Sequence, residues 1–137
     1  MDKTFHLEII TPQRAFYSGD VEMVAIKTID GEMGILKGHI PMVVPVAVGP
    51  VKIFESGKCL IAVVNEGFME INRDRAVILV DTAEWPEEID VSRAEAAKAR
   101  ALERLKHKLS RVEYMRTQAA LSRAMARLKV SREFLRK

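Results

Sequence analysis

Hydrophobic and polar residues alternate along the first part of the chain, in short runs separated by turn-forming residues. Phe5, Leu7 and Ile9 alternate with polar residues, which predicts a half-buried strand over residues 4–10. Further strands are predicted at 14–17, 21–29, 43–48, 51–54, 59–64, 68–71 and 76–80. Many short strands at close spacing, without helices between them, favour an antiparallel sandwich or barrel.

Turn-forming residues indicate how these strands connect. Residues 55–58 read Glu-Ser-Gly-Lys and residues 72–75 read Asn-Arg-Asp-Arg, and each segment predicts a hairpin turn. Pro45 lies inside an apolar run, and because proline lacks a backbone donor it places that run at a sheet edge or a bend. Turns are also expected at 18–20, 30–34 and 49–50.

The pattern changes to that of helices after Pro86, because no glycine or proline occurs beyond it. Asp90 or Ser92 can cap a first helix that runs to about Lys106. Alanines recur along this helix at a helical spacing, with one leucine: Ala94, Ala97, Ala101 and Leu105. These small residues predict a helix that approaches a partner closely but gains little apolar burial from it.

A second helix is predicted to start near Val112, because Ser110 and Glu113 have the spacing of a capping box. It also contains several alanines, so the two helices can form an antiparallel hairpin. No glycine or proline separates them, and a single continuous helix is therefore the alternative. The predicted fold class is α+β, with a β-sandwich domain over residues 1–86 and a helical hairpin over 87–137.

Charge divides the chain at nearly the same place. Residues 1–88 carry 8 Lys and Arg against 14 Asp and Glu, a net charge of −6, whereas residues 89–137 carry 14 against 5, a net charge of +9. The basic tail suits an anionic partner. No apolar run reaches the roughly 20 residues of a membrane span, and Cys59, the single cysteine, cannot form an intramolecular disulfide.

Arginines repeat on both predicted helices with spacings of seven and four, which put their side chains on one helical face. They are Arg93, Arg100 and Arg104 on the first helix and Arg116, Arg123 and Arg127 on the second. If the hairpin closes with these faces together, the guanidinium groups converge and require an anion between them. The alternative is that both rows are solvated faces of basic helices.

Catalytic and metal-binding patterns are missing from the sequence. His39 has no metal-ligand spacing with His6 or His107, and we find no nucleophile–base arrangement and no phosphate-binding glycine loop. The expectation is a protein that is not an enzyme, without catalytic residues, metal or cofactor.

Several motifs together resemble the epsilon subunit of bacterial rotary ATP synthases over nearly the whole chain. They are VEMV at 21–24, GEMGIL at 31–36, GHIP at 38–41, GFMEI at 67–71, IDVSRA at 89–94 and RAMARL at 123–128. Two segments depart from the family pattern. Lys37 stands where the family usually has proline, and residues 106–111 lack loop-forming residues, which leaves the position of the interhelical turn open.

The resemblance implies a sandwich of about ten strands that binds the gamma subunit and the ring of c subunits, with the segment containing Glu32 and His39 at the ring. The helical hairpin would lie compact against the sandwich or extend along gamma. Extended, its basic face, with Arg116, Arg123, Arg127 and Arg132, would meet an acidic segment of the beta subunits and block ATP hydrolysis. The chain would work at the cytoplasmic face of the cell membrane, as a peripheral part of the complex without membrane insertion.

The resemblance also implies that ATP, as a regulatory ligand, binds the compact hairpin. Carried over by motif, the site would comprise Glu84, Ile89, Asp90, Arg93, Ala94, Arg100, Arg123 and Arg127. The arginines would hold phosphates, and Ile89 and Asp90 would lie near the adenine. Two alternatives stay open: a stalk subunit whose ATP motif is idle, and a nucleic-acid-binding module that uses its basic helices.

Overall fold

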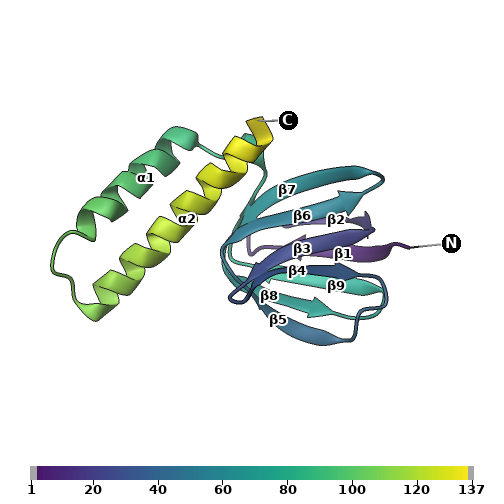
Figure 1. The fold of residues 1–137 in the computed structure, drawn as a ribbon. Coiled ribbons are helices and arrows are strands. Elements are labelled where there is room, and N and C mark those ends of the chain that lie inside the picture. Colours follow the sequence, from purple (N-terminus) through teal and green to yellow (C-terminus); the bar gives the residue numbers. More distant parts are fainter. Residues whose placement is uncertain (1–2, 136–137) are drawn as a thin grey trace.

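A computed structural model describes residues 3–135 of the chain and shows two packed β-sheets followed by two helices (Figure 1). Each sheet has five strands. The strands are β1 (Phe5–Ile10), β2 (Ala15–Val21), β3 (Met23–Thr28), β4 (Gly31–Leu36), β5 (Met42–Val46), β6 (Gly49–Glu55), β7 (Lys58–Val64), β8 (Gly67–Ile71), β9 (Arg75–Val80) and β10 (Ala83–Glu84). The predicted sandwich with a helical hairpin is confirmed.

The first sheet has the strand order β2-β1-β9-β8-β5. Along β1, Phe5, Leu7 and Ile9 are buried and the residues between them are half-buried, as the alternation predicts. β1 pairs with β9 in parallel, whereas every other strand pair in the described chain is antiparallel. β5, which contains Pro45, lies at the edge of the sheet, in agreement with its missing donor.

The second sheet has the order β10-β7-β6-β3-β4 and contains the predicted hairpin of β6 and β7. At its turn, Ser56 has φ 48° and Gly57 has φ 78°. Two successive residues with positive φ match the twist of the strands that they join, which is why this short turn includes a glycine. The hairpin of β8 and β9 is confirmed as well.

Three segments predicted as turns are wrong in whole or in part, because their glycines lie in strands. Residues 18–20 continue β2, residues 31–34 belong to β4, and Gly49 begins β6. Gly49 is buried against Lys27: a Cβ there would lie 2.8 Å from the lysine Cδ. A side chain at position 49 would therefore have to displace Lys27, and sequence alone does not distinguish this close approach from a turn as the reason for the glycine.

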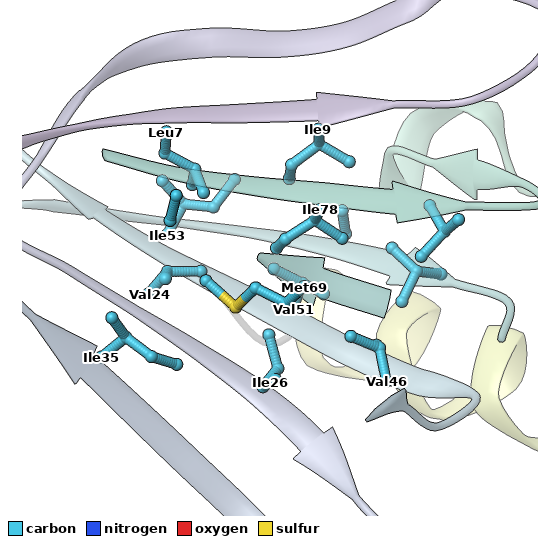
Figure 2. Packing of buried hydrophobic residues seen from close by; sticks show 14 of the residues in the cluster. Leu7, Ile9, Val24, Ile26, Ile35, Val46, Val51, Ile53, Met69 and Ile78 are labelled. Atoms are coloured by element: carbon cyan, nitrogen blue, oxygen red, sulfur yellow. The ribbon is translucent and has the colours of Figure 1, made fainter. Parts of the chain in front are cut away.

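The main hydrophobic core lies between the two sheets (Figure 2). Leu7 and Ile78 come from the first sheet, Val24 and Ile53 come from the second, and all four are fully buried. Burying such a side chain contributes about 1.5–3 kcal/mol relative to leaving it exposed. The sandwich therefore has a core of its own, independent of the helices.

The helical part comprises a short 3-10 helix η1 (Pro86–Glu88), α1 (Val91–Arg104) and α2 (Arg111–Leu135). Asp90 caps α1, because its side chain accepts a hydrogen bond from the backbone of Arg93. Ser110 accepts one from the backbone of Glu113 at the start of α2, as predicted. The chain leaves the helical path between the two helices, so the alternative of one continuous helix is wrong.

Candidate functional site

The helical hairpin lies against the sandwich through α2, and α1 packs on the other side of α2 (Figure 1). Val130 of α2 is fully buried in a small cluster with Ile61 and Val63 of β7 and with Ile89, which precedes α1. This cluster is separate from the core between the sheets. The docking of the helices therefore depends on a few side chains.

The two helices meet through small residues, as the alanine pattern predicts. Ala94 and Ala101 of α1 and Ala124 of α2 are each at most 4% exposed. By contrast, the side chains of Arg93, Arg100, Arg104 and Arg116 are exposed. The hairpin therefore closes with its alanines inside, and these four arginines lie outside the interface.

One ion pair joins α2 to the sandwich close to this seam. The Nε of Arg127 donates to Oε1 of Glu84, at the end of β10, over 2.6 Å. The side chains are 32% and 27% exposed, so solvent screens this pair less than a surface pair. The contact brings together two of the predicted site residues from positions 43 apart in sequence.

Arg123 lies beside this pair. It lines a cavity of about 10 Å³ together with Glu84, Arg127 and residues of β7, including Val63 and Val64. A space of that size holds about one water molecule and no nucleotide. An anion can therefore reach both arginines through this cavity only if its walls, which include Glu84 and Arg127, move apart.

The remaining predicted residues lie around the start of α1. Ile89 is buried in the docking cluster, and Ala94 is buried in the seam. Asp90 is exposed, and its Oδ1 accepts from the Arg93 backbone N–H at 3.1 Å. Among residues 3–135, the side chains of Arg93 and Arg100 make no hydrogen bond or ion pair, so both guanidinium groups are available to a ligand.

A junction around Trp85, a residue that suggests packing between the two parts of the chain, fixes the segment between the sandwich and α1. The Trp85 ring stacks on Phe16 with centroids 4.3 Å apart, and Arg14 lies over the Phe16 ring. Glu88 accepts from the backbone N–H of Trp85 at 2.8 Å. No spacing rule relates residues so far apart in sequence, so the only sign of this junction in the sequence is the presence of the tryptophan.

Tyr17 also belongs to this junction. Its hydroxyl donates to a carboxylate oxygen of Glu55 and links β2 of one sheet to β6 of the other. Partial burial raises the pKa of the Tyr17 hydroxyl above its ordinary range, and the hydrogen bond to Glu55 raises it further. The hydroxyl therefore stays protonated at neutral pH and acts as a structural donor.

Glu32 and His39 do not share one loop. Glu32 is near the start of β4, with one carboxylate oxygen 3.9 Å from the Lys52 ammonium. His39 follows the other end of β4, and its Nδ1 lies 2.8 Å from the backbone oxygen of Ile40. Any single partner that touches both residues must extend along this edge strand.

Residues 3–135 contain no group of three or more His, Cys, Asp or Glu side chains placed to hold a metal ion. In the same part of the chain, no helix is both long enough and apolar enough to cross a bilayer.

Comparisons with known proteins identify the family. Residues 4–86 match the family model "ATP synthase, Delta/Epsilon chain, beta-sandwich domain", and residues 87–132 match "ATP synthase, Delta/Epsilon chain, long alpha-helix domain". The chain is 59% identical over 125 residues to the ATP synthase epsilon chain of Ruminiclostridium cellulolyticum, covering 91% of this chain and 93% of the relative. It is 51% identical to that of Caldanaerobacter subterraneus, covering 98% of each.

Solved structures share the fold at low identity. A chain in the mitochondrial ATP synthase of Euglena gracilis superimposes with a TM-score of 0.81 at 23% identity, over 92% of this chain and 80% of that one. The chain belongs to the family of bacterial ATP synthase epsilon chains, as the resemblance of its motifs predicted. Members of this family are non-catalytic chains of the ATP synthase, which agrees with the predicted absence of a catalytic function.

Proposed function

We propose that the chain is a regulatory subunit of the central stalk, in which the sandwich (1–86) couples gamma to the c ring and the hairpin (87–137) switches between a docked and an extended state. ATP favours the docked state, and extension inhibits ATP hydrolysis. The observation that carries this proposal is the Glu84–Arg127 pair, at 2.6 Å, which ties α2 to the sandwich at the predicted ATP site.

The docked state is held by few contacts, which a switch requires. Of the five apolar residues buried on the two helices, three are alanines and the larger two are Leu128 and Val130, and each methyl-sized group contributes only about 0.8 kcal/mol. Against the sandwich, α2 buries Val130 and partly buries Ala126. A free-energy difference of a few kcal/mol between two states is the range in which a ligand can move the balance.

ATP would shift the equilibrium between the docked and extended states through contacts to its phosphates. Arg123 and Arg127 lie on the sandwich side of the hairpin, and Arg93 and Arg100 are free on α1. The phosphates of ATP would replace the Glu84 carboxylate as the partner of Arg127. Ile89, Asp90 and Ala94 would form the adenine end. A ligand that binds only the docked state stabilises it by about 1.4 kcal/mol at ten times its Kd, a tenfold shift.

The extended state would use the same arginines on a protein partner. Arg116, Arg123, Arg127 and Arg132 are spread along α2, and a net charge of +9 over residues 89–137 suits an acidic segment of the beta subunits. Arg127 cannot bind ATP and that segment at once. This competition makes ATP binding and inhibition mutually exclusive.

The partners of the sandwich would meet its exposed surfaces. Val43 of β5 and Leu79 of β9 lie in the same sheet, and they are 64% and 49% exposed. Such an apolar outer face suits a stable contact with gamma. Glu32 and His39 would face the c ring, which places the subunit at the cytoplasmic face of the cell membrane.

Calorimetry of ATP binding to the isolated protein tests the site. Arg93→Ala and Arg127→Ala should each weaken ATP binding at least tenfold, because each removes a charge-assisted contact to phosphate. Arg116→Ala, a change of an exposed arginine on the same helix, is the control and should bind as the parent does. Unchanged affinity in both site variants would show that the proposed site is wrong.

The alternative of an idle ATP motif has one observation in its favour, since Glu84 already neutralises Arg127 in the docked hairpin. It predicts no heat of ATP binding in the parent protein, with or without magnesium. Family membership favours both versions of the stalk subunit over a nucleic-acid-binding module.

A further inference from the structure

A groove of about 1010 Å³ lies between the docked hairpin and one end of the sandwich, and it is partly open to solvent. One wall consists of α2 residues with one residue of α1: Ala119, Ser122, Met125, Ala126, Leu128, Lys129, Arg132 and Lys98. The other wall consists of the end of β3, the segment from Pro45 to Pro50, and the start of β8. The groove exists only while the hairpin is docked.

This groove is distinct from the proposed ATP site. The α2 residues that line the small cavity beside Glu84 are Arg123 and Arg127, and neither of them lines the groove. The two spaces adjoin at Val48, which lines both, but they contact different residues of α2. A ligand in the groove would therefore not displace ATP, and both would favour the docked state.

The lining combines an apolar surface with an excess of positive charge. Phe68 is 58% exposed and Met125 is 51% exposed, and they come from opposite walls. The cations are Lys27, Lys98, Lys129 and Arg132, against the single carboxylate of Glu66. Among residues 3–135, none of these four cations takes part in an ion pair.

The shape of the groove selects among anionic ligands. Its helical wall runs from Ala119 to Arg132, which corresponds to about 20 Å at 1.5 Å per residue. Small anions would use the cations alone and leave Phe68 and Met125 in water. An amphipathic helix with acidic flanks satisfies both features, because its apolar face covers the lining and its carboxylates meet the cations.

We propose that this groove binds an acidic amphipathic helix of a partner chain. The apolar face of that helix lies against Phe68 and Met125, and its carboxylates pair with Lys98, Lys129 and Arg132. The partner thereby holds the hairpin docked without using Arg123 or Arg127 of the proposed nucleotide site. The inference rests on the docked hairpin and requires no ATP, so it can fail or succeed independently of nucleotide binding.

Fluorescence anisotropy of the isolated full chain, without nucleotide and at low salt, tests the proposal. The probe is a labelled peptide of about 14 residues with leucine at positions one, four, eight and eleven, glutamate at positions five, seven, twelve and fourteen, and alanine elsewhere, so that no two glutamates repel each other at helical spacing. A second peptide has lysine in place of glutamate, and a third has the composition of the first with its leucines scrambled. We expect only the first peptide to bind, with an affinity that falls as salt is added.

Two matched variants locate the site. Lys98→Gln, Lys129→Gln and Arg132→Gln together should weaken binding about tenfold, since three charge pairs are lost. Lys58→Gln, Lys108→Gln and Arg111→Gln together remove the same charge from exposed positions outside the groove and should change affinity less than twofold. Met125→Asp should weaken binding as strongly as the first triple change.

Three results would overturn the proposal. They are no binding of the first peptide, equal binding of the scrambled peptide, and equal losses in the two triple variants. The second result would mean that the groove is only a basic surface for anions. Titration of ATP into the same variants gives a separate result for the nucleotide site.

Discussion

Arg14 and Glu88, which are 74 positions apart in sequence, are joined by a hydrogen bond of 2.8 Å from the arginine Nη2 to the glutamate Oε1. Because Glu88 also accepts from the Trp85 backbone, this one carboxylate connects the start of β2 to the segment that leads into α1. The direction in which the hairpin leaves the sandwich is fixed at this point, outside the hairpin itself.

The first prediction concerns this junction and its dependence on pH. The bonds from Arg14 and from the Trp85 backbone lower the pKa of Glu88 below its ordinary value. A carboxyl group with a lowered folded pKa stabilises the fold above its unfolded pKa and loses that contribution as pH falls through the folded pKa. Urea unfolding should therefore show Glu88→Gln less stable than the parent at pH 7.

The same experiment at low pH supplies its own check. The stability difference should shrink as pH falls below the ordinary glutamate value of 4.5, because the parent carboxyl is then neutral as well. Glu87→Gln, a change at an exposed neighbour, should leave stability unchanged at both pH values. A difference that stays constant down to acid pH would contradict the role assigned to the Glu88 charge.

The second prediction concerns the tie between α2 and the sandwich. Arg127→Ala should favour the undocked hairpin by about 1 kcal/mol, because it leaves the partly buried Glu84 carboxylate without its partner. Energy transfer between dyes placed on the sandwich and at the hairpin tip would report the docked fraction. Arg116→Ala, in which an exposed arginine is lost, should not change the transfer.

The third prediction concerns the core between the sheets. Leu7→Ala removes a fully buried side chain and should lower the free energy of unfolding by about 2–5 kcal/mol. Leu79→Ala, at a position that is 49% exposed on β9, should cost far less. Equal losses in chemical denaturation would mean that Leu79 is not on an open face in solution.

The fourth prediction concerns Gly67, the first residue of β8. A Cβ at this position would lie 1.9 Å from the backbone oxygen of Leu79, so Gly67→Ala must displace β8 from β9. We expect a loss of about 1–3 kcal/mol in thermal or urea unfolding. Gly34→Ala is the matched control, since its Cβ would meet only the Met23 sulfur at 3.5 Å, an ordinary contact.

Local patterns predicted much of the fold correctly because they act over a few residues. The alternation of Phe5, Leu7 and Ile9, the hairpin turn at Ser56 and Gly57, and the Ser110 cap are all present in the structure. Turns predicted from glycines were wrong where the glycine lies in a strand rather than in a turn. Gly49 beside Lys27 is the clearest case, because its reason is a contact with a residue far away in the chain.

The candidate site likewise has a part that the local sequence predicts and a part that only the fold shows. The motif of residues 89–94 supplied Asp90 and Arg93, and the structure places them together at the start of α1, where neighbours in sequence must lie. The pairing of Glu84 with Arg127, and the free guanidinium groups of Arg93 and Arg100, were not deducible from spacing. Periodicity indicates which residues share a helix face, but it does not say which face turns inward.

By itself, the sequence determined the family, the two-part architecture, the alanine seam of the hairpin and the division of charge between the two parts. Tertiary structure alone decided that the alanines close the hairpin while Arg93, Arg100, Arg104 and Arg116 stay exposed, that Glu84 holds Arg127, and that a groove with apolar and basic residues forms beside α2. The physical reason is the distance along the sequence over which each interaction acts. Propensity, capping and amphipathic pattern depend on neighbours within about one or two turns of chain, whereas docking depends on which surfaces exclude water from each other after the whole chain has folded.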